Sequence, residues 1–181
     1  MAERPPETIE GEDFVLHRVQ VDDAKIIADT VAANLGRLSV WMPWAVPSAG
    51  TVEEQVRRLH RSVAGWEAGT SFEYLAVHPG TGTHLGNFAL DRRIGPGALR
   101  VGYWLSEDAI GYGYATAGVQ LLTEAALRLT DIDRLEIHHD AGNLRGQQVP
   151  QRLGYRLDRI EEAEPVAPGE SGCSLIWVYP P

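Results

Sequence analysis

A glycine-rich loop that leads into a predicted helix is the clearest chemical feature of the sequence. The loop reads Ile110-Gly111-Tyr112-Gly113-Tyr114-Ala115-Thr116. Small residues at a helix N-terminus leave backbone N–H groups uncovered, and these groups together with the helix dipole can hold a phosphate or pyrophosphate. The spacing matches neither the dinucleotide fingerprint, which needs glycine at position 116, nor a P-loop, which needs a following Gly-Lys-Ser/Thr. Taken alone, the loop is equally compatible with a glycine turn that caps a helix.

Two side chains beyond that helix could move a proton. The segment 134–139 is a predicted strand, and alternation places Glu136 and His138 on one face and His139 on the other. Carboxylates and imidazoles are common general bases, although each of these side chains is also compatible with a structural or solvent-exposed role. Adjacent histidines on a strand point to opposite faces, so they do not predict a metal site. The single cysteine, Cys173, excludes a cysteine-based zinc cluster.

Four further residues are candidates for contacting a substrate. Trp41 and Trp44 lie in the apolar segment 38–50, whose two prolines prevent a regular helix. The two tryptophans either line a binding site or anchor this loop on the core. Glu73 and Asn87 lie on predicted central strands, where their side chains either face a cleft or lie on the surface.

The elements that must position these residues follow from the hydrophobic pattern. Helices are predicted at 22–35, 51–68, 113–129 and 143–153, and strands at 14–18, 72–77, 83–90, 98–105, 134–139, 154–159 and 174–179. This order, with helices first and a strand–helix–strand–helix–strand run last, predicts a mixed α/β sheet flanked by helices. Residues 1–12 are predicted to be a flexible acidic lead-in, and residues 13–181 a single domain.

The glycine loop and a second segment together resemble the GNAT family of acyl-CoA-dependent N-acyltransferases. Gly102-Tyr-Trp-Leu105 with the loop looks like the fourth strand and pyrophosphate loop of that family. The segment from Asn143 to Tyr155 is similar to its Asn-x-x-Ser…Leu-Gly-Phe segment, with the same residue count. Trp41-Met-Pro-Trp44 resembles the tryptophan-proline loop of the branch that contains RimJ and RimL, the ribosomal-protein N-terminal acetyltransferases. The resemblance spans residues 14–179.

The resemblance implies a fold, a donor and an acceptor. The fold is α/β (α+β), with a mixed sheet of six to seven strands splayed between the fourth and fifth and about four flanking helices. The donor is acetyl-CoA, without a metal, and the acceptor is a small-molecule amine or a protein N-terminus that enters beneath the Trp41–Trp44 loop. A homodimer is common in this branch. Donor contacts are assigned to the main chain of Trp104, Leu105 and Ser106, to the loop Ile110–Thr116, and to Asn143 and Arg145.

Three positions depart from the family pattern. Ile110 replaces the usual Arg or Gln, Gly146 replaces a Ser, and Pro150 replaces a Tyr, so both common proton donors to the departing thiolate are absent. Pro150 is also expected to shorten or kink its helix, since a proline forced into a helix interior costs about 3 kcal/mol. In one interpretation, solvent protonates the departing CoA thiolate and no protein acid is needed. The alternatives are a ligand-binding or regulatory protein without turnover, or an enzyme that uses a longer acyl-CoA or an aminoacyl-tRNA.

The overall charge excludes some partners and leaves others open. The 181 residues carry a net charge of −9, which argues against generic binding to nucleic acids or anionic membranes. No signal peptide or membrane-spanning run is evident, so a cytoplasmic location is expected. Residues 1–13 and 158–170 carry −4 each, and the remainder carries only −1. Whether those acids attract a cationic amine or only aid solubility depends on where they lie.

Overall fold

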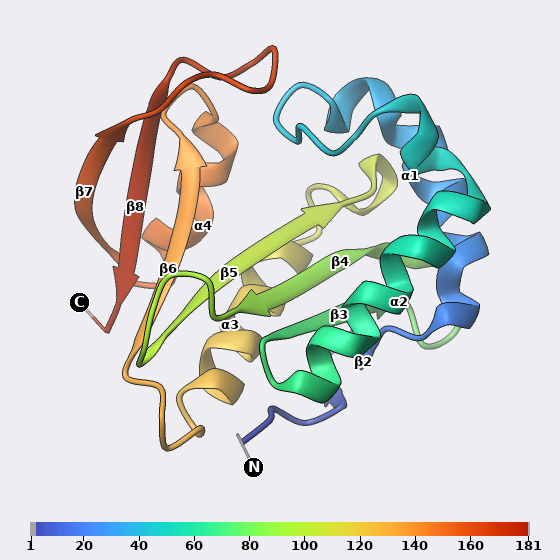
Figure 1. The fold of residues 1–181 in the computed structure, drawn as a ribbon, viewed down its shortest axis with the longest axis horizontal. Helices are drawn as coiled ribbons and strands as arrows, with labels where there is room; N and C mark the ends of the chain where they lie inside the picture. Colours follow the sequence, from blue (N-terminus) through green and yellow to red (C-terminus); the bar gives the residue numbers. More distant parts are fainter. Residues whose placement is uncertain (1–2, 181) are drawn as a thin grey trace.

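A mixed sheet of eight strands forms the centre of the structure, a computed structural model that describes residues 3–180 (Figure 1). The strands lie in the order β1-β2-β3-β4-β5-β6-β8-β7. They are β1 (Thr8–Glu10), β2 (Val15–Arg18), β3 (Ser71–Val77), β4 (His84–Asp91), β5 (Ala98–Leu105), β6 (Arg134–Asp140), β7 (Arg156–Glu162) and β8 (Cys173–Tyr179). The described residues form four α-helices: α1 (Ala24–Leu38), α2 (Val52–Ala68), α3 (Tyr114–Ala126) and α4 (Leu144–Arg152). The predicted α/β architecture is confirmed.

The sheet opens between β5 and β6. These two strands pair in parallel, but only from Ala98 to Val101 on β5 and from Arg134 to Ile137 on β6. Beyond that point both strands continue without pairing to each other, and Figure 1 shows them diverging. The backbone groups of both strands that would have completed the ladder are therefore available to other partners.

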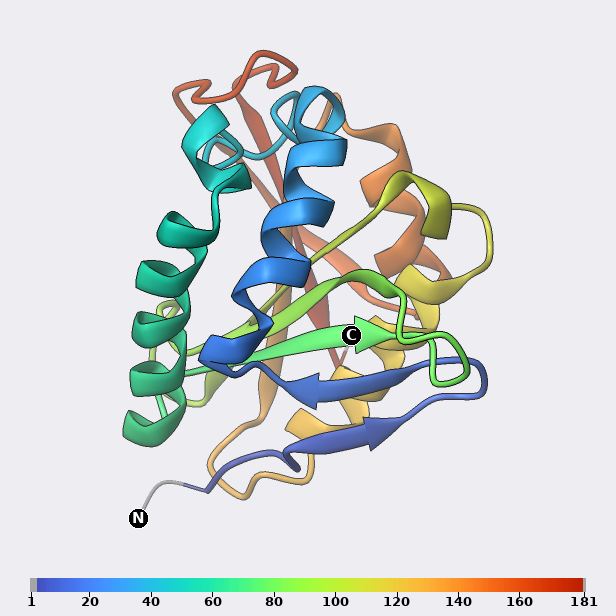
Figure 2. The same ribbon diagram turned by 90° about the vertical axis from the view of Figure 1, so that its right-hand side faces the viewer.

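Helices cover both faces of the sheet, as Figure 2 shows edge-on. On one face α1 and α2 pack against β3 and β4, and on the other α3 and α4 pack against β4, β5 and β6. The side chain of Thr51 accepts a hydrogen bond from the Glu54 N–H at 3.3 Å, which confirms the predicted helix start there. Gly69 ends α2 in the left-handed region at φ 70°, where glycine carries no steric penalty. No helix among residues 3–180 is long and apolar enough to cross a membrane.

The N-terminal segment is not a loose lead-in. Thr8–Glu10 forms β1 and pairs antiparallel with β2, and the Tyr74 hydroxyl donates to the carbonyl of Pro6 at 2.8 Å. This three-residue strand is too short to show an alternating pattern, which is why the sheet has eight strands where six to seven were predicted. Met1 and Ala2, the start of the predicted lead-in, lie outside the described residues.

Pro150 does not interrupt its helix. The helix α4 passes through Pro150 and continues to Arg152. The missing N–H would have bonded to the carbonyl of Gly146, four residues earlier. The Tyr103 hydroxyl instead approaches that carbonyl at 3.5 Å, reaching from β5 to α4 across the opening of the sheet. Because this contact offers the carbonyl another polar partner, part of the cost expected for an internal proline is offset.

Candidate active site

A cleft of about 660 Å³ lies where β5 and β6 diverge. At one end it is lined by Asn143 and Gly146 at the start of α4. At the other end it reaches Arg58 on α2 and Glu73 on β3. A single hollow thus connects the opening of the sheet with the face covered by α1 and α2, and its size is typical of a small-molecule site.

The predicted pyrophosphate loop forms an open helix N-terminus. Gly111 and Gly113 have φ values of 94° and 84°, which favour glycine, and Gly113 is the N-cap of α3. No side chain caps the N–H groups of the first turn, which includes Ala115 and Thr116. The Tyr114 ring packs edge-on against Phe14 at 5.5 Å, while Tyr112 is largely exposed. The N–H groups of this turn and the helix dipole therefore form a surface suited to an anion.

The main chain of β5 corrects part of the donor prediction. The Ser106 N–H donates to the carbonyl of Leu85 on β4 at 2.8 Å. Since hydrogen-bonded pairs alternate along an antiparallel ladder, the main-chain groups of Trp104 also face β4. Those of Tyr103 and Leu105 face the opening instead, and the Leu105 carbonyl accepts a hydrogen bond from the Arg37 guanidinium. The side chain of Trp104 also lines the cleft, whereas only its main chain was predicted to contribute.

Two residues of the α4 segment were predicted to contact the donor. Asn143 lines the cleft and is the N-cap of α4, where its Oδ1 accepts from the Gly146 N–H at 2.9 Å. Arg145 is exposed on the first turn of the helix. Burial lowers the pKa of Arg37 from its ordinary value, and the nearby charge of Arg145 adds to this lowering. The two arginines are therefore close enough to interact, and the carboxylate of Glu107, which acts on the pKa of Arg37 in the opposite direction, lies near them.

Replacing Asn143 by alanine is expected to weaken acetyl-CoA binding roughly 5-fold and to lower the free energy of unfolding by about 1 kcal/mol. The first effect reflects the lost amide and the second the lost helix cap. Asn143→Ser is the matched control, because serine keeps a capping oxygen but not the amide. Calorimetric titration with acetyl-CoA and thermal unfolding separate the two effects. If the alanine variant keeps its full affinity, Asn143 does not contact the donor.

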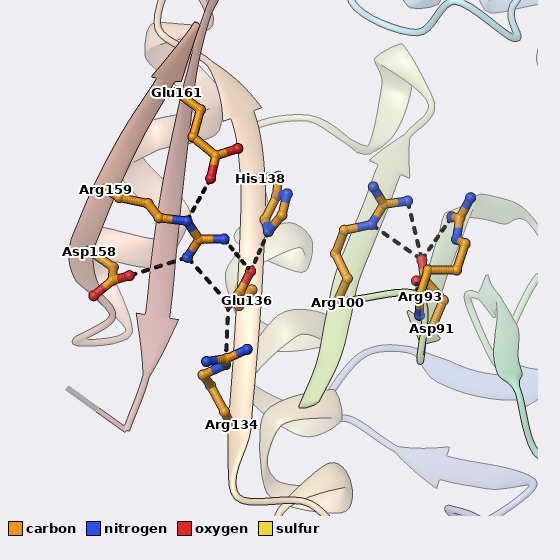
Figure 3. A network of polar contacts seen from close by, with 9 residues as sticks. All are labelled: Asp91, Arg93, Arg100, Arg134, Glu136, His138, Asp158, Arg159 and Glu161. Carbon is orange, nitrogen blue, oxygen red and sulfur yellow. Dashed lines mark hydrogen bonds and ion pairs between the residues drawn. The ribbon is translucent and has the colours of Figure 1, made fainter. Parts of the chain in front are cut away.

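Glu136 and His138 form a hydrogen-bonded pair on β6, in which Glu136 is buried and His138 is partly exposed (Figure 3). Glu136 is only 1% exposed, and its Oε2 lies 2.6 Å from His138 Nε2. Arg134 and Arg159 also reach this carboxylate, at 3.2 and 3.4 Å. Burial alone would raise the pKa of Glu136, but the hydrogen bonds from His138 and Arg159 outweigh it and hold the pKa below its ordinary value. Glu136 therefore stays ionised and is a poor proton acceptor.

His138 lines the cleft, whereas Glu136 lies behind it. When Nε2–H is donated to Glu136, Nδ1 carries the free lone pair of the ring. His139 also borders the cleft, but Trp177 donates to its Nε2 at 2.8 Å and its Nδ1 lies 2.9 Å from the Asp140 carbonyl. Burial lowers the pKa of His139. Of the two histidines, His138 alone has a ring nitrogen that makes no hydrogen bond within the described residues.

Both predicted polar acceptor residues line the cleft, but their polar atoms are already bonded. Glu73 accepts from Arg58 at 2.7 Å on both oxygens and from Ser62 at 2.7 Å. The amide nitrogen of Asn87 donates to Glu73 at 2.9 Å, and its oxygen lies 2.9 Å from His84 Nε2. This network fixes the floor of the cleft and holds the Arg58 guanidinium in place.

The two tryptophans of the loop after α1 have separate positions. Trp44 lines the cleft, where its ring lies 5.9 Å from that of Trp104. Trp41 is not among the lining residues. It packs instead beside Gly142 and Gly169, and the Gly169 N–H donates to the Val40 carbonyl at 2.8 Å. Trp41 thus lies where this loop meets the β7–β8 loop, while Trp44 lines the cleft.

Sequence reasoning missed several lining residues. Tyr103 was part of a matched motif, but its hydroxyl contact with α4 depends on how the two strands diverge. The helical pattern places Arg58 on the polar face of an amphipathic helix. Its contact with Glu73 on another element could not be predicted from the neighbouring sequence. Arg93 and Arg100 also border the cleft, where both pair with Asp91. Arg93 was not wholly missed, because in the sequence Arg92-Arg93 is compatible with contacts to an acidic substrate or the CoA phosphates, as well as with a charge pair at a hairpin tip.

Comparisons with known proteins agree with this fold. The acetyltransferase (GNAT) domain family matches residues 13–156. YdaF of Bacillus subtilis (strain 168), provisionally named a ribosomal N-acetyltransferase, is 26% identical over 153 residues, which is 80% of this chain and 79% of YdaF. A RimL structure, a ribosomal L7/L12 α-N-protein acetyltransferase with coenzyme A, superposes with a TM-score of 0.86 at 19% identity, covering 95% of this chain and 97% of RimL.

Two further solved structures share the fold. The ribosomal-protein-S5-alanine acetyltransferase of Vibrio fischeri superposes with a TM-score of 0.85 at 19% identity, and 94% of each chain is covered. The microcin C7 self-immunity acetyltransferase MccE, solved with acetyl-CoA and AMP, superposes with a TM-score of 0.86 at 16% identity, and 96% of each chain is covered. The match over residues 13–156 shows that this chain belongs to the acetyltransferase (GNAT) domain family, as its motifs predicted.

Proposed function

We propose that this protein transfers an acetyl group from acetyl-CoA to a primary amine, and that the amine is a protein N-terminus. The position of His138 carries the proposal. Its ring lines the cleft on β6 at the opening of the sheet, between the start of α4 and the face covered by α1 and α2. The names of YdaF and RimL refer to ribosomal acceptors, which supports a protein acceptor here.

The donor side fits acetyl-CoA, which supplies an acetyl group activated as a thioester. The uncapped first turn of α3 receives the pyrophosphate on its N–H groups. Asn143 borders the path from the other side. The backbone N–H groups of Tyr103 and Leu105 point into the opening, where they are placed to stabilise negative charge on the thioester oxygen.

The pair of His138 and Glu136 serves the acceptor. An α-amino group has a pKa of about 8, so much of it is protonated at neutral pH and must lose a proton before it attacks. Nδ1 of His138 takes that proton, and the Glu136 carboxylate stabilises the charged ring. Arg134 and Arg159 hold Glu136 ionised, so Glu136 is a positioning residue rather than the base. The neutral amine nitrogen then bonds to the acetyl carbon, the carbon–sulfur bond breaks, and the nitrogen releases its second surplus proton to solvent as the amide forms.

Tyr103 supplies the hydrogen bond that Gly146 and Pro150 lack. Its hydroxyl crosses the opening and lies 3.5 Å from the Gly146 carbonyl, beside the position of the absent serine. Burial raises the pKa of Tyr103 well above its ordinary value, so the hydroxyl stays protonated and remains a donor. We propose that the hydroxyl turns its one hydrogen from the Gly146 carbonyl to the departing sulfur, which takes its proton from solvent.

Tyr103→Phe is therefore expected to lower kcat by about 10-fold or more, because a hydrogen bond to a charged atom contributes roughly 1.5–3 kcal/mol. The measurement is steady-state thiol release with saturating acetyl-CoA. Tyr155→Phe is the matched control, since that buried hydroxyl bonds to Thr123 at 2.7 Å and does not line the cleft. Equal rates for Tyr103→Phe and Tyr155→Phe would remove Tyr103 from the reaction.

A second candidate is a protein that binds the donor without turnover, and Gly146 and Pro150 favour it. One experiment separates the two. Acetyl-CoA is titrated by calorimetry, and thiol release is then followed with peptides that have free N-termini. The proposed enzyme binds acetyl-CoA and releases thiol only when a free amine is present. Binding without release over a broad peptide panel would establish the second candidate, and no binding at millimolar acetyl-CoA would exclude both.

A further inference from the structure

Arginines gather at the acceptor end of the cleft. Arg58, Arg93 and Arg100 line it from α2, from the turn after β4 and from β5. A smaller hollow of about 280 Å³ lies beside them and adds Arg61. Side chains of Glu73 and Asp91 are the carboxylates that line either hollow in the described part of the chain. Four guanidinium groups therefore face two carboxylates in the hollows, and Arg61 also pairs with Glu54 outside them at 3.8 Å, which leaves an excess of one positive charge.

The carboxylates lie beneath the arginines rather than beside them. Asp91 and Glu73 are 13% and 15% exposed, whereas Arg93 and Arg100 are 73% and 36% exposed. Figure 3 shows Arg93 and Arg100 converging on Asp91, at 2.8 and 3.2 Å. Burial would raise the pKa of Asp91, but its bonds to these arginines hold the pKa below its ordinary value. One carboxylate thus anchors two guanidinium groups whose outer N–H groups face the solvent.

The acidic segments of the chain do not offset this charge. Residues of 1–13 and 158–170 that the structure describes line neither hollow. Within the cleft the local field is therefore positive although the whole protein carries −9. A second cationic group on the acceptor would meet repulsion there. A carboxylate or phosphate would meet guanidinium groups that can bind it in a fork.

We infer that the acceptor carries an anionic side chain close to its amine, and that Arg93 and Arg100 bind it. The inference rests on the proposed function. Arg100 lies opposite Glu136 in the sheet register, and His138 is two residues further along β6. Two strand residues span roughly 7 Å, which is the length of two extended peptide residues. The anionic side chain is therefore the second or third residue of the acceptor protein.

The test uses synthetic peptides that start with serine and carry glutamate, phosphoserine, glutamine or lysine at positions two and three. With acetyl-CoA saturating, kcat/KM is expected to be about 10-fold higher for glutamate than for glutamine, and lowest for lysine. The preference is expected to shrink as salt is raised. The phosphoserine arm shows whether phosphate or carboxylate is the better ligand.

Arg93→Gln combined with Arg100→Gln is expected to bring glutamate and glutamine peptides within about 3-fold of each other, without changing acetyl-CoA affinity. Arg57→Gln is the matched control, because Arg57 pairs with Glu53 and Glu54 on α2 and lines neither hollow. Arg93→Gln alone is the second variant if the double variant unfolds, since Arg93 is largely exposed.

Peptide binding provides a readout that does not need turnover. A fluorescent acidic peptide is titrated into the protein with coenzyme A present, and its anisotropy is measured. If the parent protein binds the acidic peptide and the double variant does not, the inference is supported, whether or not thiol is released. Peptide binding without thiol release overturns only the proposed function. Equal binding and equal rates for acidic and neutral peptides, or a preference that survives in the double variant, overturns the inference.

Discussion

His138→Ala is expected to lower kcat/KM for the acceptor amine by about 10²–10⁴-fold, the usual contribution of a general base. The ring lines the cleft and makes its hydrogen bond to Glu136 on the side away from the lone pair at Nδ1. Alanine removes the proton acceptor and leaves the donor side untouched. The measurement is thiol release at varied peptide concentration, with acetyl-CoA affinity determined separately by calorimetry.

Two variants make the result specific. Glu136→Gln keeps an oxygen that can accept from His138 Nε2, so its rate loss is expected to be smaller than that of His138→Ala. Because the pKa of Glu136 lies below its ordinary value, the carboxylate is ionised throughout the neutral range and does not itself shape the pH dependence there. His60→Ala, in an exposed position on α2, controls for losing a histidine. A His138→Ala enzyme with the original kcat/KM would mean that another group accepts the proton.

Thr116→Glu is expected to weaken acetyl-CoA binding at least about 100-fold while leaving the fold intact. Thr116 is the third residue of α3, where an acidic side chain stabilises a helix through its dipole by roughly 0.3–1 kcal/mol. The same charge lies where the proposed pyrophosphate binds. Repulsion between charges a few Å apart near a surface amounts to about 3–4 kcal/mol per pair. Calorimetric titration measures the affinity, and thermal unfolding measures the stability.

Thr116→Glu is expected to weaken acetyl-CoA binding while stabilising the helix, a combination that a damaged fold would not produce. Thr116→Gln has a similar size without the charge and is expected to bind acetyl-CoA within about 3-fold of the parent protein. Loss of binding together with loss of stability would point to a damaged helix rather than to repulsion. Unchanged binding in Thr116→Glu would show that the N-terminus of α3 does not hold the pyrophosphate.

The proposed donor side could be predicted from the sequence because its signals are local. Gly111 and Gly113 are needed by the turn they make, and Asn143 caps the helix that begins at the next residue. Each depends on backbone conformation within a few residues. The family pattern across these segments predicted the sheet and its opening, and both were confirmed. Residues 1–12 were misjudged because β1 gains its stability from pairing with β2 rather than from its own pattern.

The roles proposed for the acceptor residues depended on contacts between distant segments. Alternation placed Glu136 and His138 on one face, but only burial, Arg134 and Arg159 separate the ionised partner from the side chain that lines the cleft. Trp41 and Trp44 are three residues apart, yet only Trp44 reaches the cleft.

The net charge of the chain follows from the sequence, but where the charges lie depends on the tertiary structure. Composition and motifs alone determined a mixed α/β domain of the acetyltransferase family with a net charge of −9, since these follow from residue types and short-range spacing. Only the tertiary structure decided that the acids of residues 1–13 and 158–170 lie outside the cleft and that arginines from α2, β5 and the turn after β4 converge inside it. The physical reason is that electrostatic interactions act over a few Å through space, and sequence separation does not set that distance.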